Sequence, residues 1–185
     1  MNARRTNARN LGSEGMMRLL VISDTHGYLD FFRKAVSLEG PWDQIVHLGD
    51  SVLDAVELAV ELGVDVAALR GNNEYSGAGA EADEELVFEA GGVRFYAEHG
   101  HAQDLNPYAG DERLELGLRE LCARARERGA AVCLFGHTHQ PLVRREGDLL
   151  LVNPGGAGLG DKRRSYAEII VNNGEARAEI KYEAA

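Results

Sequence analysis

Residues 18–71 alternate between short apolar runs and segments with helical spacing of apolar side chains, and this alternation restricts the folds open to the chain. The runs cover 18–23, 43–49 and 64–71, and the helical segments between them cover 29–40 and 51–63. Short apolar runs are typical of buried strands, whereas apolar residues three and four apart predict one buried helix face. Strands that alternate with helices through short links favour right-handed crossovers and a largely parallel sheet.

The second half of the chain predicts antiparallel pairing. Gly91-Gly92 separates two apolar runs and is the two-residue signal of a hairpin. A helix is predicted over 111–129, and further strands are predicted in the segments AVCLFG, PLVRRE, DLLLVN, SYAEIIV and ARAEIKYE. A chain of this length with both kinds of pairing is expected to stack two mixed sheets and cover their outer faces with helices. The predicted fold class is α/β, a four-layer α-β-β-α sandwich.

One domain is expected over residues 17–185, because no linker or internal repeat interrupts the pattern. Residues 1–16 are mostly polar and lack the apolar centre of a secretory signal, so they are predicted to be a disordered N-terminal extension. Residues 75–83 are rich in glycine and alanine, which predicts a mobile loop.

Charge and composition exclude several kinds of partner. The chain has 30 acidic and 20 basic residues, a formal net charge of -10, so no extended nucleic-acid surface is expected. No apolar run approaches the roughly 20 residues of a membrane span. Cys122 and Cys133 match no metal or redox spacing and are expected to be small buried residues of a cytoplasmic protein. The oligomeric state stays open, a homo-oligomer included.

Side chains that commonly bind metals follow five of the predicted strands. Because the carboxyl ends of strands in an open α/β sheet meet in one crevice, we expect these side chains to converge. Five of the six histidines lie there, which favours a metal site over scattered structural histidines. An extended strand exit would point the last two histidines the same way. The predicted ligands are Asp24, His26, Asp50, Asn72, His99, His137 and His139.

The donor set indicates which metals fit. Two carboxylates, one amide oxygen and several imidazoles without a thiolate suit Mn²⁺, and also Ni²⁺, Fe, Co²⁺ or Zn²⁺, but neither a cysteine-rich zinc site nor an all-oxygen calcium site. Seven donors are better shared by two divalent ions with one bridging carboxylate. Two such ions carry more charge than Asp24 and Asp50 return, so the centre would attract a phosphoester inside an acidic protein.

The order of these motifs resembles that of the calcineurin-like metallophosphoesterases. The chain has DTH, GD, GNNE, HGH and GHTH in succession, then VNPGG, and its small size resembles the compact bacterial and archaeal phosphodiesterase branch. The resemblance implies the α-β-β-α sandwich and hydrolysis of a small phosphoester, above all a phosphodiester, by water activated at a dinuclear metal centre. It implies one metal held by Asp24, His26, Asp50 and His139 and another held by Asp50, Asn72, His99 and His137, with Asp50 as the bridge.

One position departs from the larger members of that family. They have histidine after the GN pair, thought to protonate the leaving oxygen or orient the phosphate, where this chain has Asn73 after Asn72. An amide cannot supply a proton as imidazole does, so a step often worth about 10²- to 10⁴-fold must come from another group or be lost. His101 is the candidate, and a histidine that only faces solvent or supports a ligand is the alternative. Diesters with good leaving groups are therefore the expected substrates.

Two other functions stay open on the sequence. One is a protein-binding scaffold on the same fold, like the retromer subunit that has lost part of the catalytic set, although the intact ligand series argues against it. The other is a metal-dependent hydrolase of an amide or lactone. Outside the metal set, we expect His47 to be buried and hydrogen-bonded and Arg70 to form a surface ion pair rather than contact a phosphate. Glu74 and the loop after it are expected to be a connection or a lid.

Overall fold

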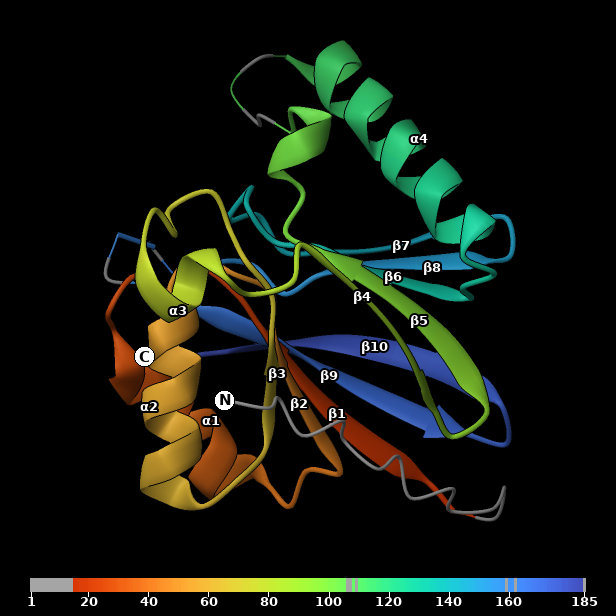
Figure 1. The fold of residues 1–185 in the computed structure, drawn as a ribbon. Helices are drawn as coiled ribbons and strands as arrows, with labels where there is room; N and C mark the ends of the chain where they lie inside the picture. Colours follow the sequence, from red (N-terminus) through yellow and green to blue (C-terminus); the bar gives the residue numbers. More distant parts are fainter. Residues whose placement is uncertain (1–14, 106–107, 109, 159, 162, 185) are drawn as a thin grey trace.

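Two stacked five-stranded sheets form the centre of the computed structural model, which describes residues 15–105, 108, 110–158, 160–161 and 163–184 (Figure 1). The first sheet has the strand order β10-β9-β1-β2-β3 and the second has the order β4-β5-β6-β8-β7. The strands are β1 (Met17–Ile22), β2 (Gln44–His47), β3 (Val66–Ala68), β4 (Glu85–Ala90), β5 (Val93–Glu98), β6 (Val132–Leu134), β7 (Leu142–Glu146), β8 (Leu149–Asn153), β9 (Ser165–Asn172) and β10 (Glu175–Tyr182).

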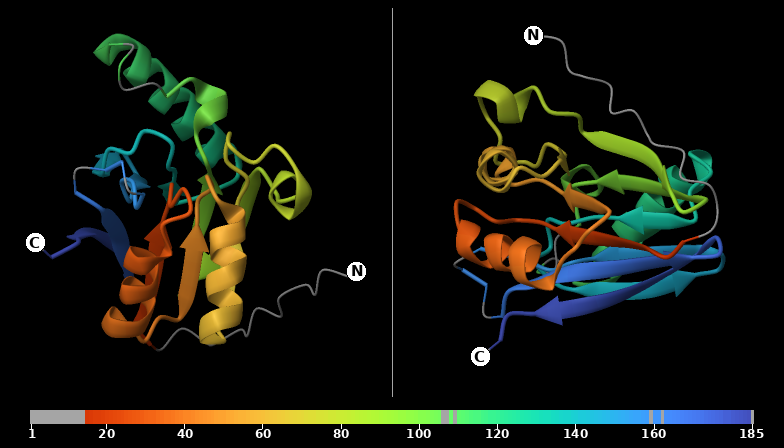
Figure 2. Two further views of the ribbon diagram at one scale, coloured as in Figure 1. Left: turned by 90° about the vertical axis from the view of Figure 1, so that its left-hand side faces the viewer. Right: turned by 90° about the horizontal axis from the view of Figure 1, so that it is seen from below.

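Helices cover the outer faces of both sheets. The helices are α1 (Leu29–Glu39), α2 (Val52–Leu62), α3 (Gly77–Ala80), the 3-10 helix η1 (His101–Gln103) and α4 (Asp111–Glu127). Figures 1 and 2 place α4 on the opposite side of the molecule from α1 and α2. The predicted four-layer α-β-β-α architecture is therefore confirmed. Among the described residues, no helix has both the length and the apolar character that a bilayer crossing would need.

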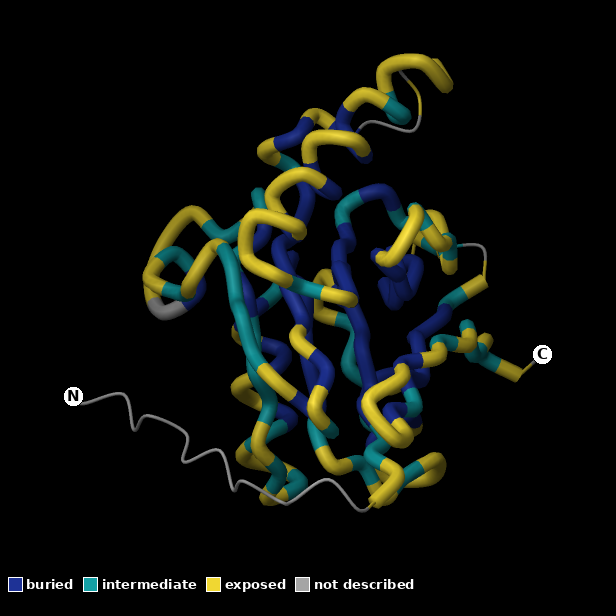
Figure 3. The backbone as a smooth tube through the Cα atoms, turned by 90° about the vertical axis from the view of Figure 1, so that its right-hand side faces the viewer, coloured by how far each residue is buried: buried dark blue, intermediate teal, exposed yellow. Residues whose placement is uncertain are grey.

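Side-chain alternation along the strands separates the layers. On β1, Leu19 and Val21 pack in the core between the two sheets, whereas Leu20 and Ile22 pack in the core beneath α1 and α2. Successive residues of a strand point to opposite faces, so one continuous apolar run serves two cores. A third core lies between the second sheet and α4. Figure 3 shows this buried interior along the central strands and exposure on the outer turns and helix faces.

Strand pairing differs in one respect from the sequence prediction. Parallel pairing of β1, β2 and β3 and the antiparallel hairpin of β4 and β5 are confirmed. The second sheet does not stay antiparallel, however, because β5 pairs parallel with β6 and β6 pairs parallel with β8. Helix α4 lies between β5 and β6 in the chain and supplies the crossover that parallel neighbours require.

Three local predictions can also be compared with the fold. The segment 75–83, predicted as a loop, contains the one-turn helix α3. The predicted extension over 1–16 falls almost entirely outside the described residues. Cys122 of α4 and Cys133 of β6 are free and buried, as expected. Both cysteines belong to the core under α4.

Candidate metal centre

The seven predicted ligands lie in loops that follow β1, β2, β3, β5 and β6. Three of these strands belong to the first sheet and two to the second, and within each sheet they run parallel. Contacts join the two sets of loops, because His99 Nδ1 is 2.8 Å from the carbonyl oxygen of Leu48 and the His137 amide donates to Asp24 Oδ2. The convergence expected from the strand ends is therefore present.

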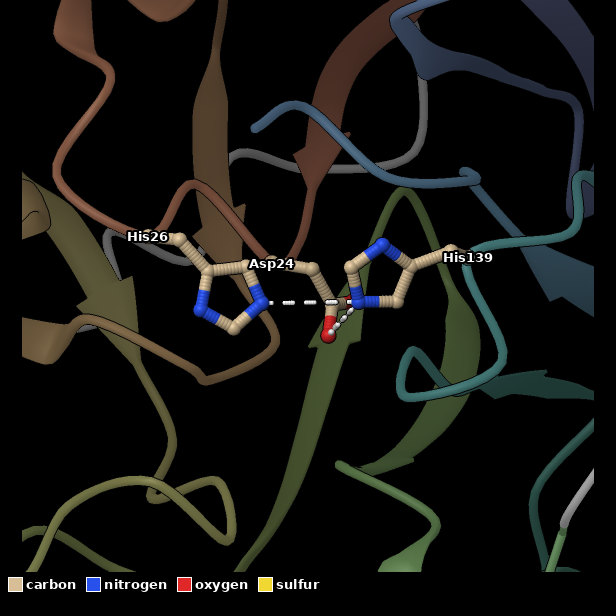
Figure 4. Close-up of side chains that lie close together, drawn as sticks. All are labelled: Asp24, His26 and His139. Carbon is tan, nitrogen blue, oxygen red and sulfur yellow. Dashed lines mark hydrogen bonds and ion pairs between the residues drawn. The ribbon is translucent and has the colours of Figure 1, made fainter. Parts of the chain in front are cut away.

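Asp24, His26 and His139 form the first of two groups with metal-binding geometry, and their ligand atoms all lie within 4.8 Å of one another. His139 Nε2 is 3.3 Å from Asp24 Oδ1 and 3.4 Å from His26 Nε2. Figure 4 shows the three side chains directed toward one another. Asp24 is fully buried, while the side chains of His26 and His139 are 37% and 36% exposed. In this group the carboxylate of Asp24 is buried, and the rings of His26 and His139 lie on the solvent side.

Asp161 orients the ring of His139. Its Oδ1 lies 2.8 Å from Nδ1 of His139 and can only accept a hydrogen bond there, so Nδ1 carries the proton. The hydrogen bonds to Asp161 and Asp24 raise the pKa of His139 to about 10. In the metal-free protein a proton on Nε2 therefore supplies the positive charge between the two carboxylates. Sequence reasoning missed Asp161, because no motif or spacing marks an aspartate in the connection between β8 and β9.

Asp24, Asp50 and His99 form the second group. His99 Nε2 is 3.6 Å from Asp50 Oδ1 and 3.9 Å from Asp24 Oδ1. Because the Leu48 carbonyl fixes the proton of His99 on Nδ1, Nε2 presents a lone pair to this group. The side-chain oxygen of Asn72 lies 3.1 Å from the same Nε2. The Nε2 lone pair of His99 thus faces acceptor oxygens of Asn72, Asp50 and Asp24, with no proton between them.

The charge state of Asp24 fits a cation at this place. Burial opposes ionisation of Asp24, but the hydrogen bond from His139 and the positive charge of that ring outweigh it and lower the pKa to about 2. Asp24 Oδ1 is buried and faces two ring nitrogens, His139 Nε2 at 3.3 Å and His99 Nε2 at 3.9 Å. An ionised carboxylate is costly inside a protein unless a positive charge compensates it. Carboxylate oxygens and imidazole nitrogens of this kind suit a first-row divalent metal.

Both carboxylates lie between the two groups. Asp24 is the residue that the two groups share, whereas the family resemblance implied Asp50 as the bridge. Asp50 also faces both sides, since its Oδ2 is 3.8 Å from His26 Nε2 and its Oδ1 is 3.6 Å from His99 Nε2. The assignment of the bridge to Asp50 stays a prediction.

His137 and His101 stand beside the second group. The ring centroid of His99 is 5.2 Å from that of His137 and 5.5 Å from that of His101. Burial lowers the pKa of both His101 and His137. Nδ1 of His101 is buried and makes no hydrogen bond within the described part of the chain. His101 therefore lies beside the second group, and its role in catalysis stays a prediction.

The backbone at the predicted ligands is strained. The prediction that His137 and His139 follow an extended strand and point the same way is therefore wrong. Five predicted ligands have positive φ angles between 48° and 65°, namely Asp24, His26, Asp50, His137 and His139. His137 and His139 therefore do not alternate along a strand: His139 joins the first group and the ring of His137 lies next to His99. Non-glycine residues in this region are uncommon and gather at functional sites, where the surrounding structure holds them.

Two glycines allow the loops to approach the aspartates. A side chain at Gly71 would collide with the carboxylate and backbone amide of Asp50, and one at Gly136 would collide with Ser23 and Asp24. The lack of a side chain at these two positions therefore lets the loops crowd around the carboxylates. Asn153 of the VNPGG segment supports the same region, because its Nδ2 donates to the Gly136 carbonyl at 2.7 Å.

The loop after β3 is tied to Asp50 and to the start of α2. The backbone N–H and the side-chain Nδ2 of Asn73 both donate to the Asp50 carboxylate. Asn73 therefore orients Asp50, a predicted ligand. Glu74 accepts hydrogen bonds from the backbone amides of Gly71, Ser51 and Val52. Glu74 is therefore a cap for α2 and no lid residue. The Ser51 side chain itself makes no capping hydrogen bond.

Two residues set aside from the metal set behave as expected. His47 is fully buried, and its Nε2 lies 3.0 Å from Thr25 Oγ1. Arg70 pairs with the carboxylate of Glu84, and its Nη1 donates to the carbonyl of Ala80 at 3.1 Å. Neither residue belongs to either group of candidate ligands.

Comparison with known proteins agrees with the geometry. The sequence model of the calcineurin-like phosphoesterase superfamily domain matches residues 17–174. The chain is 31% identical to a Bacillus subtilis protein named probable metallophosphoesterase YsnB, over 86% of this chain and 88% of that protein. It is 26% identical to a protein of Methanocaldococcus jannaschii named a phosphodiesterase, over 75% of this chain and 83% of the relative.

Solved structures share the fold. A crystal structure of a Streptococcus pneumoniae protein described as a predicted phosphoesterase superposes with a TM-score of 0.71 and 25% identity, over 90% of this chain and 89% of the other. Wild-type Vps29 of Entamoeba histolytica complexed with zinc superposes with a TM-score of 0.67 and 17% identity, over 90% and 98% of the two chains, which shows the fold alone. By the match over 17–174, the chain belongs to the calcineurin-like phosphoesterase superfamily.

Proposed function

We propose that the protein is a metal-dependent phosphodiesterase that hydrolyses a small phosphoester with a water activated at a dinuclear centre. The observation that carries this proposal is the meeting of carboxylate oxygens and imidazole nitrogens from both groups around the buried, ionised Asp24. Manganese is the metal we favour, with nickel, iron, cobalt or zinc as alternatives that suit the same donors.

The two groups would hold one cation each. Asp24, His26 and His139 supply the first, and Asp24, Asp50 and His99 supply the second, with Asn72 and His137 beside it. When bound, two divalent ions polarise a phosphoryl oxygen, lower the pKa of the attacking water and stabilise an in-line displacement. Asp161 and the Leu48 carbonyl keep Nε2 of His139 and Nε2 of His99 directed inward, so the protein orients both rings before any ion arrives.

The remaining polar residues would act on the substrate. His26 and His139 are more than a third exposed and border the side from which a phosphoester can enter. His101 lies beside His99 and would protonate the leaving oxygen or hold a phosphoryl oxygen through its ring nitrogen. Because the Asn73 amide group binds Asp50, it would act through that carboxylate.

A diester is the favoured substrate class for two reasons. One relative carries the name phosphodiesterase. In addition, Asn73 replaces the family's histidine after GN, so the enzyme would favour substrates that need little acid assistance at the leaving oxygen. Localisation in the cytoplasm is part of the same proposal, and the free, buried Cys122 and Cys133 suit a reducing compartment.

The experiment uses metal-stripped protein reloaded separately with Mn²⁺, Ni²⁺, Zn²⁺ and Mg²⁺. Hydrolysis of bis-p-nitrophenyl phosphate is compared with that of p-nitrophenyl phosphate, and bound metal is counted by mass spectrometry. We expect two ions per chain and metal-dependent diester cleavage, both impaired in Asp50→Asn. Folded protein that binds metal but cleaves neither ester would overturn the catalytic proposal and favour the protein-binding scaffold.

A further inference from the structure

Three buried side chains that the proposed chemistry does not use form a continuous hydrogen-bonded chain beneath the centre. His47, Thr25 and Asp54 are 0%, 0% and 8% exposed. His47 Nε2 lies 3.0 Å from Thr25 Oγ1, and the Thr25 hydroxyl donates to Asp54 Oδ2 at 2.6 Å. The residues come from β2, from the loop after β1 and from the first turn of α2. We call this set the His47–Thr25–Asp54 relay.

The direction of every hydrogen bond in the relay is fixed by chemistry. His47 Nδ1 accepts from the backbone amide of Gly49 at 3.2 Å, so the proton of the ring must be on Nε2. Nε2 therefore donates to Thr25, and the Thr25 hydroxyl is left to donate to Asp54. Burial lowers the pKa of His47 to about 4, which agrees with the neutral ring that this pattern requires.

Both ends of the relay reach the loops that carry predicted ligands. At one end His47 accepts from the amide of Gly49, the residue before Asp50. At the other end Asp54 Oδ2 accepts from the amide of Gly27, the residue after His26, at 2.8 Å. Backbone hydrogen bonds also connect the two loops, since the amide of Asp24 donates to the Gly49 carbonyl at 3.0 Å. The relay and these backbone hydrogen bonds thus form a closed loop of contacts between the segment of Asp24 and His26 and the segment of Asp50.

The backbone joined by these contacts is strained. Asp24, His26 and Asp50 have φ angles of 56°, 48° and 57°, a region that residues other than glycine seldom adopt unless their surroundings hold them there. A buried hydroxyl between a neutral imidazole and a carboxylate tolerates no slip of either loop, because any movement would leave a buried polar group unpaired. The relay is therefore well placed to fix the ligand geometry in advance.

We propose that the His47–Thr25–Asp54 relay is a positioning device that holds the loops of Asp24, His26 and Asp50 ready for the cation and so sets the metal affinity of the centre. The proposal rests on metal binding at the proposed centre. It assigns no contact with substrate or metal to the three relay residues. Supporting groups of this kind typically change metal affinity by about 10- to 100-fold.

The test compares Thr25→Val with Thr25→Ser. Valine keeps the shape of threonine but removes the hydroxyl, whereas serine keeps the hydroxyl. Mn²⁺ affinity is measured by titration calorimetry, and hydrogen exchange of residues 24–27 and 49–51 is measured in the metal-free protein. We expect Thr25→Val to weaken Mn²⁺ binding by about 10- to 100-fold and to speed exchange in both loops. Thr25→Ser should stay within a few-fold of the wild type.

A control separates positioning from general loss of stability. Leu58→Val removes a methylene from a fully buried residue of α2 that packs in the core under the helices. It should lower the melting temperature without changing Mn²⁺ affinity. If Thr25→Val does not fold, Asp54→Ala is used with the same two measurements. Wild-type affinity and exchange in the folded variant would overturn the proposal, whereas a wild type that binds no Mn²⁺ would reject the proposed function and the relay with it.

Discussion

Asp161 Oδ1 lies 2.8 Å from Nδ1 of His139, and this contact decides which nitrogen of that ring faces Asp24 and His26. Asp161 is itself held, because its Oδ2 accepts the backbone amide of Gly158 at 2.9 Å. A side chain at Gly156 would collide with the same carboxylate, so the backbone closes tightly around it. The pair is an arrangement in which a carboxylate fixes the tautomer and direction of a metal-binding imidazole.

Removing the Asp161 carboxylate should weaken metal binding. We expect Asp161→Ala to lower Mn²⁺ affinity by about 10- to 100-fold, because the His139 ring loses its fixed tautomer. Asp161→Asn should lose less, since an amide oxygen can still accept from Nδ1. Titration calorimetry measures both variants, and Asp148→Ala, at a side chain that is 93% exposed, is the matched control. Wild-type affinity in Asp161→Ala would remove the role given to this residue.

His101 should affect turnover and leave metal content unchanged. His101→Ala is expected to lower kcat by about 10²-fold or more if the ring protonates the leaving oxygen, because general acid catalysis contributes about that factor. His101→Gln keeps a hydrogen-bond donor but cannot transfer a proton. A loss in both variants indicates proton transfer, and recovery in the glutamine variant indicates that His101 only orients the phosphate. Unchanged kcat in both variants, with two ions bound, would exclude His101 from catalysis.

The rate should depend on the leaving group. Asn73 cannot protonate the leaving oxygen, so diesters of acidic phenols should react faster than those of weakly acidic alcohols. The measurement is kcat/KM for a series of methyl aryl phosphates in which only the phenol pKa varies. Asn73→His restores the histidine of larger family members and should raise the rate of the poorest substrates by up to about 10²-fold. Equal rates along the wild-type series would contradict this account.

The sequence was sufficient to predict where the ligands meet. Parallel strands end at the same edge of a sheet, so Asp24, Asp50 and Asn72 could be expected together from three strand-like runs alone. The alternation of Leu19 and Leu20 between two cores likewise follows from a period of two in a continuous apolar run. Such features depend on the spacing of residues along the chain, so they can be predicted without a structure.

Other features could not be read from the sequence. Asp161 and Glu74 act through contacts with residues in other loops, and a contact of that kind leaves no periodic signal. The positive φ angles of His137 and His139 could not be predicted, since this region is uncommon for any residue other than glycine and the local sequence does not mark it. The parallel pairing of β5 with β6 was also missed, because a helix after a hairpin does not reveal on which side the chain returns.

Glu74 should stabilise the loops on both sides of Asp50. Glu74→Ala removes the acceptor of three backbone amides, those of Gly71, Ser51 and Val52. Buried donors left without an acceptor cost about 1 to 3 kcal/mol, so the free energy of unfolding should fall by about that amount. Glu74→Gln keeps one acceptor oxygen and should lose less. Urea unfolding measures both variants, with Glu57→Ala on the exposed face of α2 as control, and equal midpoints for Glu74→Ala and wild type would contradict the capping role.

Glu85 should contribute stability that depends on pH. The hydrogen bond from Arg128 Nη2, at 2.8 Å, lowers the pKa of Glu85 below its ordinary 4.5 and joins β4 to the end of α4. A lowered carboxyl pKa stabilises the fold above the unfolded pKa, and this contribution disappears as the pH falls through the folded pKa. Glu85→Gln should therefore lower the melting temperature near pH 7 but hardly at all near pH 3. Because the side chain is 36% exposed, the effect near pH 7 should be at most about 1 kcal/mol, or roughly 2 to 4 °C. Thermal unfolding of both proteins at the two pH values measures the difference, and an equal shift at both would show that the charge of Glu85 has no part in it.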